Sequence, residues 1–245
     1  MIDFVTHNFI LIKRKEIWFF DGEDAKNCAY TVYSVAVKRP DHEVLHLRSQ
    51  LTNKIDLSLE KEDILAAMHP TTRYDIKRGE KLHLDVKTNF QPSAVELQQL
   101  IEENISFSKE KKISPVNFTW LQATTKHSCL CLRQIYLDET MLVTHIYLYD
   151  SKRAFLVHSF HNVNFKNSAI RGYANKFLHW KDMQLFKERG LSHYNWGGVD
   201  AIPQGIADFK SRFGGELIEN YSYIESTLFA RILINLYKRL FGNYN

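Results

Sequence analysis

Three strand-like segments follow one another closely in the second half of the chain. Residues 130–137, 141–149 and 153–160 are rich in aliphatic, β-branched and aromatic side chains. The connections Asp138-Glu139-Thr140 and Asp150-Ser151-Lys152 are short and polar. Connections of this length join antiparallel neighbours, because a parallel crossover needs about a dozen residues or more. The sequence therefore predicts an antiparallel three-strand meander, around which the rest of the fold must be built.

Helices and further strands are predicted on both sides of the meander. Upstream, Ser93 and Glu96 form an S-x-x-E capping box for a helix that ends in the lysine-rich segment 109–112. Downstream, the pattern alternates helix, strand, helix and strand over residues 169–189, 193–199, 206–213 and 216–224. This order predicts an α+β fold with a mixed, mostly antiparallel central sheet flanked by helices.

The first half of the chain is predicted to be strand-rich. Strand-like segments lie at residues 9–12, 16–20, 30–37, 43–47 and 81–86. Helices are expected over residues 60–68 and 71–78, the second closed by Gly79, because glycine suits the position after a helix end. The segment 89–92 reads as a linker or crossover.

Composition places the chain among globular proteins without naming a ligand. Its 245 residues are 44% hydrophobic and carry a net charge of +4, which is compatible with an anionic ligand but does not require one. Cys28, Cys129 and Cys131 lack the spacing of a zinc site, so we expect buried free thiols, a reducing cytoplasm and no metal. Asp3 and His7 interrupt the first apolar stretch, which argues against a secretory signal.

The last residues predict an amphipathic, basic helix. Its apolar positions alternate with the cations Arg231, Lys238 and Arg239. The simpler expectation is that the apolar side packs on the protein's own core. Peripheral docking on an anionic membrane face is the alternative, since both the cations and the apolar stripe suit it.

Two glycine-rich segments near residue 200 point to a functional site. Residues 194–199 read YNWGGV, and residues 205–216 read GIADFKSRFGGE. Glycines let the backbone come close to a bound group, and a helix start offers free N–H groups to an acyl carbonyl or a phosphate.

These segments also carry a family resemblance. The run NWGGVDAIPQGIADFKSRFGG over residues 195–215 resembles the end of the FemABX group, whose members attach amino acids to peptidoglycan precursors, and of related FemAB-like acetyltransferases. Residues 55–86 resemble the same family, and the element order after residue 89 resembles the GNAT acyltransferase fold. The resemblance spans residues 51–225 and implies three parts. These are a reduced N-terminal GNAT-like half-domain over residues 1–88, a GNAT-like acyltransferase domain over residues 89–225 and a C-terminal amphipathic helix over residues 226–245.

The resemblance implies where an acyl donor binds. In GNAT enzymes the donor's pantetheine lies between two splayed parallel strands, here residues 153–160 and 193–199, and the pyrophosphate rests on N–H groups where the long helix begins. The loop 167–174 matches the family pattern only in its second half, because Ala169 stands where Gln or Arg is expected. The expected cofactor-binding residues are Asn167, Arg171, Gly172, Ala174, Trp196 and Gly197.

Amide formation from an acyl donor needs a neutral amine, a polarised carbonyl and a proton donor for the leaving group. Lys210 resembles the family's functional lysine and is expected to stabilise charge, while His158 and Asp200 are candidates to accept a proton. Arg73, Lys77 and His161 are candidates to bind the substrate. The competing interpretations are a solvated lysine for Lys210, a structural histidine for His158 and surface ion pairs for Arg73 and Lys77.

The sequence thus predicts an N-acyltransferase that moves an acyl group, expected to be acetyl from acetyl-CoA, to an amine of a sugar or small metabolite. One alternative is a FemABX-type enzyme that uses aminoacyl-tRNA and a cell-wall or lipid-linked acceptor. The other is a degenerate GNAT module that binds a partner without catalysis. The expected location is cytoplasmic, with peripheral contact at the inner membrane face left open.

Overall fold

The computed structural model describes residues 1–9, 12–22, 28–199 and 204–241 and divides the chain into two compact units. The first unit combines Met1–Leu51 with Glu219–Asn245, and the second is the continuous segment Thr52–Ile218. The chain passes between the units on strands β4 (Leu45–Asp56) and β10 (Glu216–Ser226). The family-based boundaries at residues 88 and 225 stay predictions.

The second unit contains the predicted meander. Its strands follow the order β4-β9-β8-β7-β6-β5, and neighbours are antiparallel except for the parallel pair β8 and β9. The strands β5 to β9 span Asp85–Asn89, Leu130–Leu137, Thr140–Tyr149, Arg153–His161 and His193–Gly198. The expected α+β class with a mixed, mostly antiparallel sheet is confirmed, and β6 has the predicted bounds.

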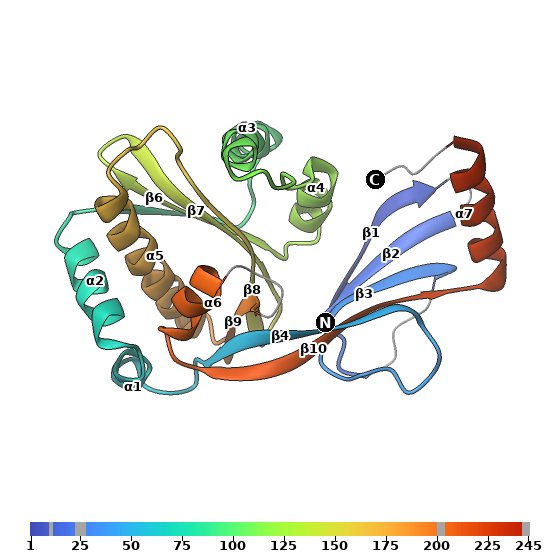
Figure 1. The fold of residues 1–245 in the computed structure, drawn as a ribbon, viewed down its shortest axis with the longest axis horizontal. Helices are drawn as coiled ribbons and strands as arrows, with labels where there is room; N and C mark the ends of the chain where they lie inside the picture. Colours follow the sequence, from blue (N-terminus) through green and yellow to red (C-terminus); the bar gives the residue numbers. More distant parts are fainter. Residues whose placement is uncertain (10–11, 23–27, 200–203, 242–245) are drawn as a thin grey trace. The chain divides into compact units, whose positions relative to one another are not determined.

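Helices cover both faces of this sheet. They are α1 to α6, over Lys61–Ala66, Pro70–Glu80, Ala94–Lys111, Phe118–Lys126, Ser168–Glu188 and Gln204–Ser211. Figure 1 shows α3 and α4 on one side of β6 and β7, with α2 and α5 on the other. The Ser93 hydroxyl accepts the Glu96 N–H at 3.2 Å, and the Glu96 carboxylate accepts the Ser93 N–H at 2.7 Å, so the predicted capping box is confirmed.

The core of the second unit lies between α5 and strands β7 to β9. It is rich in aromatic side chains that have almost no exposed surface, namely Tyr147, Phe186, Tyr194, Trp196 and Phe213. Aromatic groups of this size supply much of the buried apolar area of a core. Cys129 and Cys131 are buried free thiols, as expected, whereas Cys28 is free but only half-buried. Burial raises the pKa of Cys129 to about 12.

Gly79 does not end its helix, contrary to the sequence prediction. The helix α2 continues to Glu80, and Gly79 is buried where α2 crosses α5. A Cβ atom at this position would lie 2.6 Å from Cβ of Phe177 and 2.8 Å from the carbonyl oxygen of Tyr173. The glycine is therefore required by close helix packing and not by a left-handed turn.

The first unit has strands β1, β2 and β3 over Ile2–Phe9, Ile12–Trp18 and Tyr30–Ala36. Together with β10 they follow the order β1-β2-β3-β10, in which β2 and β3 are parallel. The strand expected at residues 16–20 overlaps β2 but begins too late, and the start of β1 at Ile2 was not predicted. The strand expected at residues 9–12 includes two residues that lie outside the described part of the chain. The helix α7 (Leu228–Phe241) completes the unit. Among the described residues, no helix combines the length and apolarity needed to cross a bilayer.

Candidate functional site

Strands β8 and β9 pair at one end only. Their parallel ladder joins Arg153–Phe155 to His193–Asn195, while β8 continues to His161 and β9 to Gly198. On its other side, β8 pairs with β7 through a bulge, since Ile146 faces His158 and Tyr147 faces Leu156, which leaves Val157 as an extra residue. The two strands that the resemblance predicts to splay are thus parallel neighbours whose ladder stops early.

A cavity of about 160 Å³ lies beyond the end of this ladder, beside the start of α5. Helix α5 begins after Asn167, whose side-chain oxygen accepts the N–H of Ile170 at 3.1 Å. Arg171 and Gly172 line the cavity from α5, and an added Cβ at Gly172 would meet no atom within 4 Å. The remaining lining residues are Val143, Ser159, Phe160, His161, Ser168 and Asn175.

The charge around the cavity is positive. Burial, together with the nearby cations Arg171 and Lys111 and against the opposing effect of Glu110, lowers the pKa of His161 to about 4. His161 is therefore neutral at pH 7. The Arg171 guanidinium donates to the carbonyl oxygen of Phe165 at 3.0 Å, which fixes this side chain beside the helix start. A helix N-terminus and an adjacent guanidinium together favour an anionic group.

The glycine-rich segments meet at the end of β9. Nζ of Lys210, on α6, donates to the carbonyl oxygen of Gly198 at 2.7 Å, and burial lowers the pKa of Lys210 to about 8. Gly197 has a φ of +71°, and its backbone N–H donates to the side-chain oxygen of Asn195 at 2.8 Å. This arrangement holds a partly desolvated amine against a strand end.

Two further glycines position α6. Gly214 and Gly215 have φ values of +75° and +92°, and added Cβ atoms would lie 2.9 Å from the carbonyl oxygen of Ala67 and 2.5 Å from that of Lys54. Asn53 donates from Nδ2 to the carbonyl oxygens of Lys210 and Gly214 at 3.1 and 2.9 Å. The double glycine thus closes α6 tightly against β4 and fixes the backbone at Lys210.

A buried polar network crosses the core between the cavity and Lys210. At its centre the Asp182 carboxylate accepts hydrogen bonds from Nε of Arg133, Nδ1 of His145 and the hydroxyl of Tyr147, at 2.6, 2.7 and 2.6 Å. Burial alone would raise the pKa of Asp182, but the hydrogen bond from His145 and the charge of Arg133 outweigh it and lower the pKa. Asp182 is therefore ionised and can only accept.

The hydrogen-bond directions along the network follow from this carboxylate. Because Tyr147 donates to Asp182, its oxygen accepts from Tyr194 at 2.8 Å, and the oxygen of Tyr194 accepts from Nδ1 of His179 at 2.8 Å. Burial lowers the pKa of His179 well below its usual value, so its Nε2 carries a lone pair. Within the described part of the chain, no residue bonds to this nitrogen.

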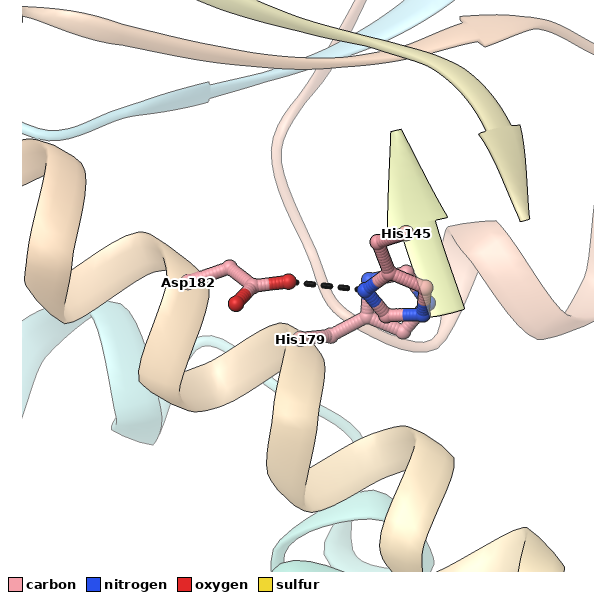
Figure 2. A group of neighbouring side chains, drawn as sticks. All are labelled: His145, His179 and Asp182. Atoms are coloured by element: carbon pink, nitrogen blue, oxygen red, sulfur yellow. Dashed lines mark hydrogen bonds and ion pairs between the residues drawn. The ribbon is translucent and has the colours of Figure 1, made fainter. Parts of the chain in front are cut away.

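Figure 2 shows the rings of His145 and His179 stacked, with Asp182 joined to His145. The ring centroids are 4.0 Å apart, and Nε2 of His145 lies 2.9 Å from the side-chain oxygen of Asn175, which lines the cavity. The three side chains lie close enough to hold a metal ion. However, Asp182 is already paired with the guanidinium of Arg133, so the geometry is that of a hydrogen-bonded ion pair.

The structure brings some of the expected site residues together and leaves others apart. Arg171, Gly172 and His161 share the cavity. By contrast, Ala174 and Trp196 have buried side chains in the core, at 0% and 1% exposure. Their expected role in cofactor binding stays a prediction, as do the roles of Asn167 and Gly197.

His158 lies apart from the cavity lining and is hydrogen-bonded to α3. Nδ2 of Asn104 donates to its Nε2 at 2.9 Å, while the side-chain oxygen of Asn104 accepts the N–H of Val116 at 2.8 Å. Burial lowers the pKa of His158, so the ring is a neutral acceptor.

The remaining candidates lie on α2 or beyond the described residues. The Arg73 guanidinium donates to the carbonyl oxygens of Ala66 and Met68 at 2.8 and 2.6 Å and so closes the end of α1. Lys77 is exposed one turn later. Asp200 falls outside the described residues. The network residues Arg133, His145 and Asp182 were not predicted, although a charged or imidazole side chain inside an apolar strand was a usable signal for Arg133 and His145.

No protein-family model and no curated protein matches this sequence. Solved structures do match its fold. The crystal structure of FemX superimposes with a TM-score of 0.59 at 11% identity, covering 86% of this chain and 68% of FemX. The chain has the GNAT/FemAB-like fold.

Two further structures support this assignment of the GNAT/FemAB-like fold. One is described as the C-terminal domain of a lysylphosphatidylglycerol synthetase from Agrobacterium fabrum, with a TM-score of 0.55, 14% identity, and coverage of 89% of this chain and 75% of that one. The other is L-PGS from Bacillus licheniformis, with a TM-score of 0.51, 14% identity, and coverage of 81% and 68%. The superpositions establish the shared fold. Because the sequence identities are this low, the activity must be argued from the site.

Proposed function

We propose that the protein is an N-acyltransferase that moves an acyl group, in the first instance acetyl from acetyl-CoA, to an amine of a sugar or small metabolite. The observation that carries the proposal is the early end of the β8–β9 ladder, with a positively charged cavity at the far end of β8, where α5 begins. An extended thioester donor needs unpaired strand edges along which its chain can lie and an anion site for its phosphates.

The cavity fits one part of this donor. At about 160 Å³ it is smaller than the roughly 300–1,000 Å³ of sites that enclose a whole small ligand. It can hold a phosphate group next to Arg171 and the open space at Gly172, and the rest of the donor would follow the strands.

The chemistry proposed is direct transfer. The neutral amine attacks the thioester carbonyl, the C–N bond forms, and the C–S bond breaks. The nitrogen loses one proton and the leaving thiolate takes one up, so the products are an amide and a thiol. Lys210 is the first candidate to stabilise the developing oxyanion, because its amine is held at the end of β9 in a partly desolvated position. His158 and Asp200 stay candidates for proton transfer, and Arg73 and Lys77 for holding the acceptor.

Calorimetry with acetyl-CoA and CoA tests the donor. We expect binding to wild type and at least tenfold weaker binding to Arg171→Ala, since a hydrogen bond to a charged group contributes about 1.5–3 kcal/mol. Lys152→Ala is the matched control, because Lys152 is an exposed cation at the β7–β8 turn, at the opposite end of β8 from the cavity. Absence of binding at millimolar ligand would refute an acyl-CoA donor.

Aminoacyl-tRNA is the second candidate donor. It is favoured by the resemblance of residues 195–215 to the FemABX group and by the likeness of the fold to FemX, and the acceptor would then be a cell-wall or lipid-linked precursor. The net charge of +4 is compatible with this polyanion. Co-purification with tRNA that is lost at raised salt would support it, because phosphate contacts weaken steeply with salt.

The third alternative is a binding module without catalysis. In a preparation with measured acyl transfer, Lys210→Ala is expected to lower kcat by about 10²–10³, the usual cost of one oxyanion-stabilising donor. Unchanged kcat would remove Lys210 from the mechanism.

For the location we propose the cytoplasm, in keeping with the three free cysteines.

A further inference from the structure

The helix α7 exposes an apolar face. Four large apolar side chains on it face solvent, with exposed fractions of 73% for Leu228, 65% for Phe229, 49% for Ile232 and 49% for Leu236. Because successive residues of a helix turn by about 100°, these four positions fall within an arc of about 100°. They form one continuous stripe, which we call the α7 stripe.

The α7 stripe is not the side by which the helix packs on its own unit. Ala230 is fully buried, and it projects about 100° beyond Phe229, outside the stripe. The sequence analysis favoured packing of the apolar residues onto the core, and for these four residues that expectation is wrong. An exposed apolar face of this kind marks an interaction surface.

The charge of the helix indicates what the stripe binds. Between Leu228 and Phe241 the sequence contains Arg231, Lys238 and Arg239 and no acidic residue. By helical geometry Arg231 falls outside the arc of the stripe, next to Leu228, where a long cationic side chain can reach lipid phosphates. Two copies of this helix placed face to face would bring like charges together, so the charge pattern disfavours self-association.

We propose that α7 lies in the interface of an anionic lipid bilayer, with the α7 stripe inserted among the acyl chains and the Arg231 guanidinium at the headgroups. A helix of 14 residues is about 21 Å long, too short for a hydrocarbon core of about 30 Å, so it lies in the membrane plane. This surface belongs to the first unit and does not depend on the proposed acyl transfer.

Vesicle co-sedimentation of the full chain tests the proposal. We expect binding to vesicles of mixed phosphatidylcholine and phosphatidylglycerol, little binding to phosphatidylcholine alone, and weakening at raised salt. The double variant Phe229→Glu/Ile232→Glu should lose binding. Lys238→Gln and Arg239→Gln should each weaken it about fivefold, the equivalent of about 1 kcal/mol per cation.

The control for the double variant is Val95→Glu/Ile113→Glu, which places the same two charges at other exposed apolar positions, 68% and 48% exposed. It should bind anionic vesicles like wild type, and circular dichroism should show that all variants are folded. Three results would overturn the proposal. These are no binding to anionic vesicles, equal binding to both vesicle types, or a wild-type dimer in light scattering that Phe229→Glu/Ile232→Glu dissociates.

Discussion

Asp182 accepts a hydrogen bond from Nδ1 of His145 at 2.7 Å, and neither side chain has any exposed surface. The same carboxylate pairs with the Arg133 guanidinium, so strand β6, strand β7 and helix α5 are joined by one buried anion. Taking charges out of water is costly, and such a group is tolerated only when its partners satisfy it. The network is therefore a point at which small changes have large effects on stability.

Replacing Asp182 by Asn keeps the shape of the side chain and removes its charge. The Arg133 cation would then be buried without a counterion, and we expect the free energy of unfolding to fall by about 3–5 kcal/mol. Urea denaturation measures the change. The control is Asp75→Asn, which breaks the more exposed Lys176–Asp75 pair and should cost about 1 kcal/mol or less. Equal losses in both variants would contradict the central role of Asp182.

Gly79→Ala tests the contact between α2 and α5. The new methyl group would collide with Phe177 and the carbonyl of Tyr173, so we expect a loss of about 1–3 kcal/mol in unfolding free energy. Gly172→Ala on α5 has open space and should raise stability by roughly 0.5–1 kcal/mol, because alanine favours a helix more than glycine does. Thermal unfolding should therefore give shifts of opposite sign, and a stabilising Gly79→Ala would contradict the tight crossing.

The lowered pKa of Lys210 predicts a pH-dependent stability. The unfolded chain holds a proton on this amine up to about pH 10.5, while the folded protein releases it near pH 8. Between these values the unfolded state binds more protons, so the contribution of Lys210 to the unfolding free energy rises with pH. The difference between wild type and Lys210→Met should grow over this window in urea titrations, and parallel curves would show that the pKa is not lowered.

The contribution of His161 to stability should change at acidic pH, unlike that of Lys210. Its pKa is about 4 in the folded protein against 6.5 in the unfolded chain, so its contribution is complete above pH 6.5 and is lost as the pH falls towards 4. A nuclear magnetic resonance titration of the imidazole should show a neutral ring at pH 5.5. A bound phosphate in the cavity should raise this pKa, and His161→Gln should flatten the acid limb of the stability curve.

Local patterns were enough to predict much of the second unit. The bounds of β6 follow from an apolar run between polar turns, and the cap of α3 follows from Ser93 and Glu96 alone. Helix α4 was missed because its segment is rich in aromatic and threonine residues, which have weak helix propensity. The signal that was available is Asn117, whose side chain accepts the N–H of Trp120 at 2.9 Å.

The buried network could not be predicted because its members are distant in sequence. Arg133 and Asp182 are 49 residues apart and meet only once α5 packs on the sheet. Gly79 was misread for a related reason, since a glycine near a helix end suggests a local turn, whereas the contact with Phe177 is tertiary. The hydrogen bond from Lys210 to Gly198, by contrast, joins the two glycine-rich segments that the sequence had already singled out.

The division of the chain into units has a consequence for protein synthesis. Strand β3 pairs with β10, which is translated only after the whole of the second unit. During translation, residues 1–51 therefore cannot complete their sheet. The edge of β3 stays unpaired while the second unit emerges from the ribosome and can fold. Chaperone capture during translation is accordingly expected at the beginning of the chain, and not at the segment being made.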